Sequence, residues 1–133
     1  MKYPTIIDFE SIGSPELGYI TVGQEFDKIP FQIKRAYWTY YTPQSVIRGG
    51  HANIDKELVI VAVAGTINID IELTEGEKFS FKLESPHQGI YIPKLAWHTM
   101  QYSHNAVQLV LASNYYSEED YIRDYNKFKA SKR

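Results

Sequence analysis

The chain has 133 residues, a formal net charge of −2, no cysteine and 11 tyrosines. This length suits one domain with a proper core, and the absence of a long basic block argues against a nucleic-acid partner. Without cysteine, neither a disulfide framework nor a thiolate metal site can form. The N-terminus lacks the pattern of a secretory signal, and the longest apolar run, Leu58–Ala64, is far shorter than the ~20 residues needed to cross a bilayer. We therefore expect a soluble, cytoplasmic protein with no membrane partner.

Short strands separated by turns are predicted along most of the chain. In chain order they cover residues 5–9, 19–22, 32–41, 58–64, 66–73, 78–83, 89–92, 97–102 and 107–112. The continuous apolar run at 58–64 is typical of a strand buried on both faces. Residues 66–73 alternate between isoleucine and polar side chains, which indicates a half-buried strand, and Thr74-Glu75-Gly76-Glu77 leads into the next strand as a hairpin turn.

The C-terminal tail has a different pattern. Ser117 followed by Glu118, Glu119 and Asp120 is typical of a helix N-terminus, and apolar side chains then recur at helical spacing as far as Phe128. We predict one amphipathic α-helix over residues 118–130, packed on an all-β sandwich or barrel whose turns recur about every eight to twelve residues. Residues 1–133 would form a single domain.

The segment Arg48-Gly49-Gly50-His51 is the strongest candidate for function. Its glycines predict a turn that leads into a buried strand, so a guanidinium and an imidazole would lie at the mouth of the β-structure. There they would face a ligand with an anionic group and an acidic proton. A plain surface turn is the alternative. The motif Ala96-Trp97-His98 favours the functional interpretation, because facing strands would bring His98 and His51 together.

A metal centre is a competing interpretation of the same residues. It would draw on His51, Glu57 and His98 as ligands. Asn53 stands where such a site would need another imidazole, and an amide oxygen is a weak ligand for zinc, iron or nickel. We therefore expect no metal and no other cofactor.

Basic and aromatic residues precede this segment. Lys34 and Arg35 would point to opposite faces of a predicted strand, either as ordinary strand residues or with one of them against a phosphate. The tyrosines nearby are expected to pack and to form hydrogen bonds. His87 and His104 fall in predicted turns, where we expect them to be solvated.

A distinctive set of short motifs extends from about residue 29 to the C-terminus. The motifs are Ile29-Pro30-Phe31, Ile33-Lys34-Arg35, Tyr37, Arg48-Gly49, His51-Ala52, Gly65, Ser85-Pro86, Gly89, Tyr91, Trp97-His98, Val110-Leu111-Ala112-Ser113, Tyr115-Tyr116 and Asp120-Tyr121-Ile122-Arg123. In this set the chain resembles the nucleotide-sugar 3,4-ketoisomerases, cupins that convert dTDP-4-keto-6-deoxyglucose to its 3-keto isomer. The resemblance implies a double-stranded β-helix, or jelly roll, and a homodimer in which N-terminal strands join the partner's sheet.

The resemblance also implies roles for individual residues. His51 would belong to the family's active-site histidine pair, His98 would line the sugar pocket and Tyr37 would face the cleft. Arg48 would contact the nucleotide diphosphate. The other residues expected to contact a dTDP-linked substrate are Asn53, Arg35 and Lys34.

The chain departs from the family pattern at three positions. The family's His-Ala-His reads His51-Ala52-Asn53, a glutamine in the next strand is Leu58, and an N-terminal Arg-Gly pair is Leu17-Gly18. Asn53 cannot transfer a proton, although its amide could hold an enediolate oxygen.

Isomerisation through an enediol requires no cofactor. A base removes the C3 proton, and an acid protonates C4 while O3 becomes the carbonyl oxygen. We expect His51 to be the base and Tyr37 or His98 to be the second acid. Two alternatives stay open. One is a nucleotide-sugar-binding cupin of a surface-glycan pathway, such as that of lipopolysaccharide, that has lost catalysis. The other is a related sugar-nucleotide epimerase.

Overall fold

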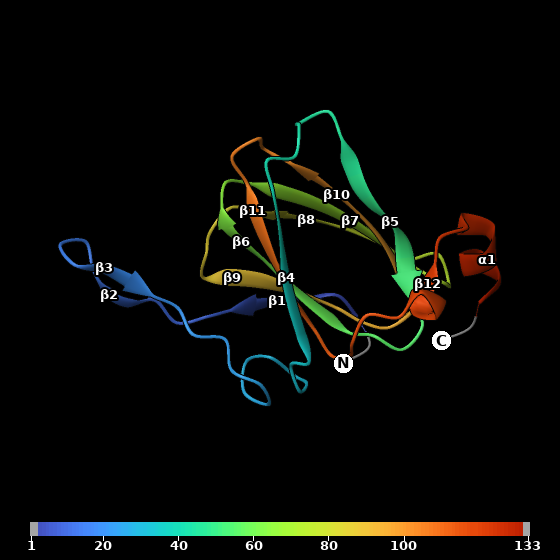
Figure 1. Cartoon of the computed structure of the whole chain (residues 1–133), viewed down its shortest axis with the longest axis horizontal. Coiled ribbons are helices and arrows are strands. Elements are labelled where there is room, and N and C mark those ends of the chain that lie inside the picture. Colours follow the sequence, from blue (N-terminus) through green and yellow to red (C-terminus); the bar gives the residue numbers. More distant parts are fainter. Residues whose placement is uncertain (1–2, 132–133) are drawn as a thin grey trace.

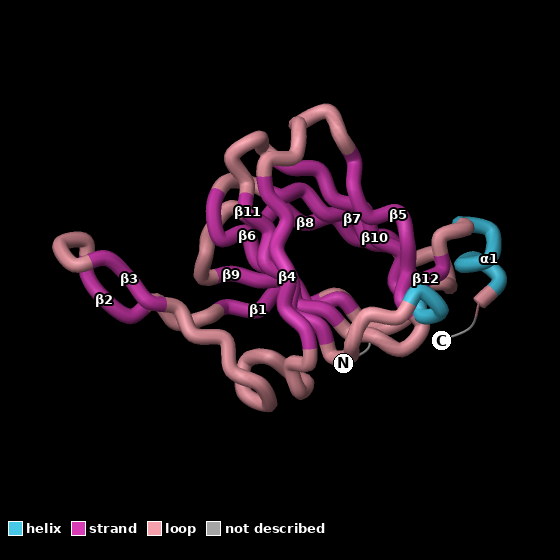
Figure 2. The backbone as a smooth tube through the Cα atoms, viewed as in Figure 1, coloured by secondary structure: helices cyan, strands magenta, loops and turns pink. Residues whose placement is uncertain are grey.

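Two antiparallel five-stranded sheets face each other in the computed structural model, which describes residues 3–131 (Figures 1 and 2). The first sheet has the order β1 (Thr5–Asp8), β9 (Gln88–Ile92), β6 (Leu58–Ala64), β11 (Val107–Ala112) and β4 (Arg35–Tyr40). The second has the order β12 (Tyr121–Ile122), β5 (Ile47–Asn53), β10 (Ala96–Tyr102), β7 (Ile67–Leu73) and β8 (Lys78–Leu83). The predicted all-β, cupin-like fold is confirmed.

The main core lies between the sheets. Strand β7 contributes its isoleucines Ile67, Ile69 and Ile71, which are at most 2% exposed, while the alternating polar residues face outward. This alternation is the one that the sequence predicted, and it sets the register of β7 against its neighbours, because a slip by one residue would turn every isoleucine to solvent.

Strand β6 is buried on both faces over most of its length, as its continuous apolar run predicted. Leu58 and Ile60 join the core between the sheets, whereas Val59 and Val61 pack against a second cluster on the outer face. Ile29 and other apolar residues of the N-terminal segment cover that face. The two last residues of the strand are exposed.

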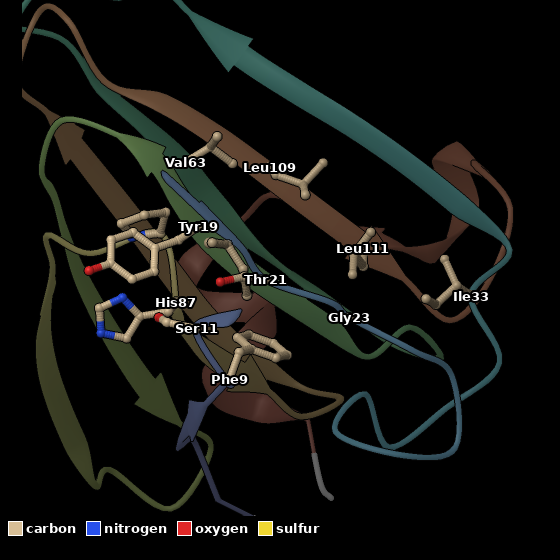
Figure 3. Close-up of a pocket in the computed structure, with 12 residues that line it drawn as sticks. Phe9, Ser11, Tyr19, Thr21, Gly23, Ile33, Val63, His87, Leu109 and Leu111 are labelled. Atoms are coloured by element: carbon tan, nitrogen blue, oxygen red, sulfur yellow. The ribbon is translucent and has the colours of Figure 1, made fainter. Parts of the chain in front are cut away.

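The N-terminal segment also forms a hairpin that the sequence indicated only in part. Strands β2 (Ile12–Ser14) and β3 (Gly18–Ile20) pair with each other and project from the body as an arm (Figure 1). Between the base of this arm and the outer face of the first sheet lies a largely apolar cavity of about 500 Å³ (Figure 3). Its lining includes Phe9, Tyr19, His87 and Leu111.

The predicted helix over residues 118–130 is wrong in extent. Residues Glu118–Asp120 form one 3₁₀ turn, Tyr121–Ile122 form β12 against β5, and α1 covers only Tyr125–Ala130. The helix begins after Asp124, whose side chain accepts a hydrogen bond from the Lys127 amide at 3.1 Å. Pairing with the edge of β5 overrides the local helical preference. Within residues 3–131, no helix has the length and apolar character to traverse a bilayer.

The facing sheets predict a strong dependence of stability on β7. We expect Ile69→Ala to lower the free energy of unfolding by about 2–5 kcal/mol, because a fully buried side chain leaves a cavity between the sheets. The matched substitution Ile54→Ala, at a side chain that is 48% exposed, should change it by less than about 1 kcal/mol. Urea unfolding measures both. Equal losses for the two variants would contradict this account of the core.

Candidate active site

A polar cavity of about 220 Å³ opens between the sheets, on the inner faces of β4, β5 and β10. Strand β12 and the residue after it close one side. Its lining combines basic, aromatic and imidazole side chains with the edge of the apolar core: Arg35, Tyr37, Thr39, Arg48, Gly49, His51, Leu58, Ile60, His98, Met100, Tyr102, Gln108, Val110, Tyr121 and Arg123.

An irregularity in β5 places its two predicted site residues together. His51 pairs with His98 and Gly49 pairs with Thr99, so Gly50 is an extra residue opposite β10. Side chains of a regular strand alternate, and residues 48 and 51 would then face opposite ways; the inserted residue puts both on the cavity side. The predicted turn at Arg48-Gly49-Gly50 is therefore wrong: the segment is a bulged strand. Turns and bulges both use the positive φ angles found here, +84° at Gly49 and +72° at Gly50.

The expected meeting of the two histidines is present. The rings of His51 and His98 lie edge to face, with 4.6 Å between their centroids. His98 is fully buried, and its Nδ1 lies 3.0 Å from the Ala96 carbonyl oxygen. Because a carbonyl can only accept, we assign the proton of the neutral ring to Nδ1, which leaves Nε2 as an acceptor.

Positive charge dominates the cavity. Arg35, Arg48 and Arg123 line it, and none of the lining side chains within residues 3–131 is a carboxylate. Burial, then the neighbouring His98, then Arg123 lower the pKa of His51 to about 3. Burial lowers the pKa of His98 as well. At neutral pH both imidazoles are uncharged, and the site as a whole favours an anionic ligand.

Arg35 and Tyr37 come from adjacent cavity-facing positions of β4. The Cζ atom of Arg35 lies 4.3 Å from the ring centroid of Tyr37, and its buried Nη1 has no hydrogen-bond partner within the described part of the chain. A buried guanidinium donor without an acceptor is costly, so it suits an incoming anion. Burial raises the pKa of Tyr37 to about 12, so this phenol keeps its proton and acts as a hydrogen-bond donor.

Tyr121 and Arg123 belong to the motif Asp120-Tyr121-Ile122-Arg123, but the sequence predicted no role in the site for either of them. The ring centroid of Tyr121 lies 4.8 Å from that of His51, and the Arg123 Cζ lies 4.5 Å from the Tyr121 ring. Outside the cavity, Glu118 accepts two hydrogen bonds from Arg123, at 2.7 and 3.1 Å. The i, i+2 spacing of Tyr121 and Arg123 would have been the signal, but it is informative only once residues 121–122 are known to be a strand.

Two of the expected substrate contacts lie elsewhere. Lys34 does not line the cavity, and its Nζ sits 5.6 Å from the ring centroid of Tyr115. Asn53 is buried, but it also does not line the cavity, and its Nδ2 donates a hydrogen bond to Asp120. The expectation that Asn53 takes the place of an imidazole facing substrate finds no support in this geometry.

The residues considered as metal ligands are not grouped as a centre. Glu57 accepts a hydrogen bond from the hydroxyl of Tyr91, away from His51. No cluster of three or more histidine, aspartate or glutamate side chains that could hold a metal ion occurs over residues 3–131. His87 and His104 are exposed, as predicted, although His87 borders the outer cavity.

Comparisons with known proteins identify the family of this chain. A family model described as "FdtA: WxcM-like, C-terminal" matches residues 2–133. The chain belongs to the FdtA family. A curated relative, the TDP-4-oxo-6-deoxy-α-D-glucose 3,4-oxoisomerase of Aneurinibacillus thermoaerophilus, is 36% identical over 126 residues, which cover 93% of this chain and 88% of the relative. The resemblance to sugar-nucleotide 3,4-ketoisomerases seen in the sequence is confirmed.

Solved structures agree with this family assignment. A 3,4-ketoisomerase from Helicobacter canadensis superposes with a TM-score of 0.91 at 33% identity, covering 98% of this chain and 97% of that one. A histidine-to-asparagine variant of the 3,4-ketoisomerase QdtA from Thermoanaerobacterium thermosaccharolyticum, in complex with TDP-4-keto-6-deoxyglucose, has a TM-score of 0.91 at 32% identity over 98% of this chain and 94% of that one.

The low pKa of His51 predicts a pH-dependent stability. Its pKa is about 3 in the folded chain against an ordinary value of 6.5. Between these values the unfolded chain binds a proton here and the folded chain does not, so the free energy of unfolding falls as the pH is lowered from about 6.5 towards 3. We expect urea unfolding to show a shallower decline for His51→Gln. Met100→Leu, a non-titrating change in the same cavity wall, should keep the wild-type slope; an unchanged slope in His51→Gln would contradict the assignment.

Proposed function

We propose that this member of the FdtA family is a sugar-nucleotide 3,4-ketoisomerase that converts dTDP-4-keto-6-deoxyglucose to a 3-keto-6-deoxyhexose. One observation carries the proposal: two uncharged imidazoles and three guanidinium groups line the same cavity, and no carboxylate is among its lining residues within 3–131. The Aneurinibacillus thermoaerophilus relative is a TDP-4-oxo-6-deoxy-α-D-glucose 3,4-oxoisomerase, and the QdtA variant is solved with TDP-4-keto-6-deoxyglucose bound.

The guanidinium groups are suited to the diphosphate. Arg48 is exposed at the mouth of the cavity, and Arg35 offers a buried donor that has no hydrogen-bond partner within residues 3–131. Arginine matches phosphate geometry with paired donors, so these residues would hold the nucleotide end and leave the sugar beside His51. The bound diphosphate would also offset the positive field around His51, which raises the pKa of this residue when substrate is present.

The reaction needs a base at C3 and donors at the oxygens. In our proposal His51 takes the C3 proton as the electron pair of the C3–H bond forms the C3–C4 double bond and the carbonyl pair moves to O4. The C3–C4 electron pair then takes the proton back from the same imidazole at C4, the O3–H pair forms the C3 carbonyl, and the O3 proton passes to O4. Tyr37 keeps its own proton and would donate a hydrogen bond to the developing oxyanion, and His98 would support the His51 ring through their edge-to-face contact.

A homodimer is part of the proposal. The arm exposes Leu17, Tyr19 and Ile20, with Leu17 at 90% exposure, and Val22 follows at 51%. Trp38 and Tyr40 are exposed on the outer side of β4 in the first sheet. Apolar surface of this kind on an arm that leaves its own body supports exchange of the N-terminal strands with a second copy. The cytoplasmic location stays a prediction.

Incubation with dTDP-4-keto-6-deoxyglucose in D₂O tests the reaction. We expect a 3-keto product that carries deuterium at C4, because the proton held by His51 exchanges with solvent. We expect His51→Gln to lower kcat by ~10²–10⁴ while TDP still binds. NMR of the recovered sugar nucleotide measures both product and label.

The same experiment separates the alternatives. Deuterium at C3 or C5 without carbonyl migration would indicate an epimerase instead. Binding of TDP with no label and no product would indicate a nucleotide-sugar-binding protein without catalysis, and would overturn the proposed function.

The dimer has its own test. We expect sedimentation velocity to show a dimer for the wild type and a monomer for Tyr19→Asp combined with Ile20→Asp, because two carboxylates on the arm oppose burial against a partner. Lys82→Asp, a charge change on an exposed residue of β8, should leave the dimer intact. A monomeric wild type would contradict strand exchange.

A further inference from the structure

Asp120 connects the C-terminal segment to the end of β5. Its Oδ2 accepts a hydrogen bond from Asn53 Nδ2 at 3.2 Å, and its Oδ1 accepts one from the Asp55 amide at 2.6 Å. Its backbone carbonyl accepts a third from the Ile54 amide at 2.9 Å. Lys56, which is 2% exposed, places its Nζ 3.9 Å from Oδ2. One aspartate is thus held by four consecutive residues.

This connection fixes the residue that follows. Tyr121 pairs with Asn53 across β12 and β5, directly after the bonded aspartate. Its ring borders the cavity and lies against His51, with a centroid separation of 4.8 Å. Lys56 Nζ and Arg123 Cζ lie 4.8 and 4.5 Å from the same ring. Negative charge that develops beside this ring during a reaction is therefore stabilised.

We propose that Tyr121 is a catalytic residue of this site, acting as its second proton-transfer group, and that Asn53 positions it through Asp120. This inference rests on the proposed 3,4-ketoisomerase function. It assigns Asn53 a purely structural task, which an asparagine can perform and which explains why its amide is engaged away from the cavity.

The proton transfers balance between two residues. His51 accepts the C3 proton, the C3–H electron pair forms the C3–C4 double bond, and the carbonyl pair moves to O4, which takes the Tyr121 hydroxyl proton. The Tyr121 phenolate then removes the O3 proton, the O3–H pair forms the C3 carbonyl, and the C3–C4 pair takes the proton back from His51 at C4. Both side chains end as they began.

Tyr37 is the less suitable phenol for this task. It lines the cavity too, but burial raises its pKa to about 12, which suits a fixed donor rather than a group that releases and regains a proton. His98 is also less suitable, because its Nδ1 is bound to the Ala96 carbonyl and the ring is fully buried.

Removal of one hydroxyl tests the catalytic half of the proposal. We expect Tyr121→Phe to lower kcat by ~10²–10⁴, with KM and TDP affinity within about threefold of the wild type, because the ring and its cation contacts are retained. The control is Tyr116→Phe, which removes an exposed hydroxyl that donates to Glu118 in the same segment without touching the cavity. It should leave kcat within about threefold.

The positioning half is tested by exchanging partners. Asn53→Asp sets a carboxylate against that of Asp120, and we expect it to lower kcat without loss of TDP binding. Combining it with Asp120→Asn restores an amide-to-carboxylate hydrogen bond with donor and acceptor exchanged, and should recover at least about tenfold of the lost kcat. In a Tyr121→Phe background, Asn53→Asp should cause no further fall in kcat, because the group it positions is already absent.

Each outcome decides the matter. Tyr121→Phe with kcat within about threefold of an active wild type would overturn the catalytic assignment while the proposed function stands. Full additivity of Asn53→Asp and Tyr121→Phe, or no rescue by Asp120→Asn, would overturn the positioning role alone. An inactive wild type that still binds TDP would overturn the proposed function and this inference with it.

Discussion

The extra residue in β5 decides which side chains share the cavity. A regular strand would send Arg48 and His51 to opposite faces, and the bulge at Gly50 turns both inward, opposite Met100 and His98. Gly49 has little freedom to change, because an added Cβ would lie 2.7 Å from the His98 carbonyl oxygen at a φ of +84°. The two adjacent glycines therefore allow one strand to present a guanidinium and an imidazole to the same cavity.

A second constraint acts on the other side of His51. Strand β12 has two residues and little apolar burial of its own, so its place depends on the hydrogen bonds of Asp120 with the 53–55 segment. These bonds connect a chemically inert residue, Asn53, to the aromatic wall of the cavity. Asn53, which stands where the family pattern has an imidazole, therefore helps to set the position of the Tyr121 phenol.

Strand patterns with a strong period were predicted well, and elements that depend on distant partners were not. Leu58–Ala64, Lys78–Leu83 and Val107–Ala112 have the predicted bounds, because apolar alternation and burial specify them locally. Residues 121–122 form a strand only because β5 offers them an edge. The site followed the same rule: His51, His98 and Arg48 converge as expected, whereas Tyr121 and Arg123 enter through a pairing that no local pattern contains.

No carboxylate lines the cavity in the described part of the chain, and this has a consequence for handling the protein. The guanidinium groups in this recess attract small polyanions. At physiological ionic strength, dissolved salt screens such attraction beyond ~8 Å. Phosphate and sulfate buffers would therefore occupy the recess as competitors, and raised salt would weaken the capture of sugar nucleotides. A sugar-nucleotide affinity measured in such a buffer would therefore include the displacement of bound phosphate or sulfate.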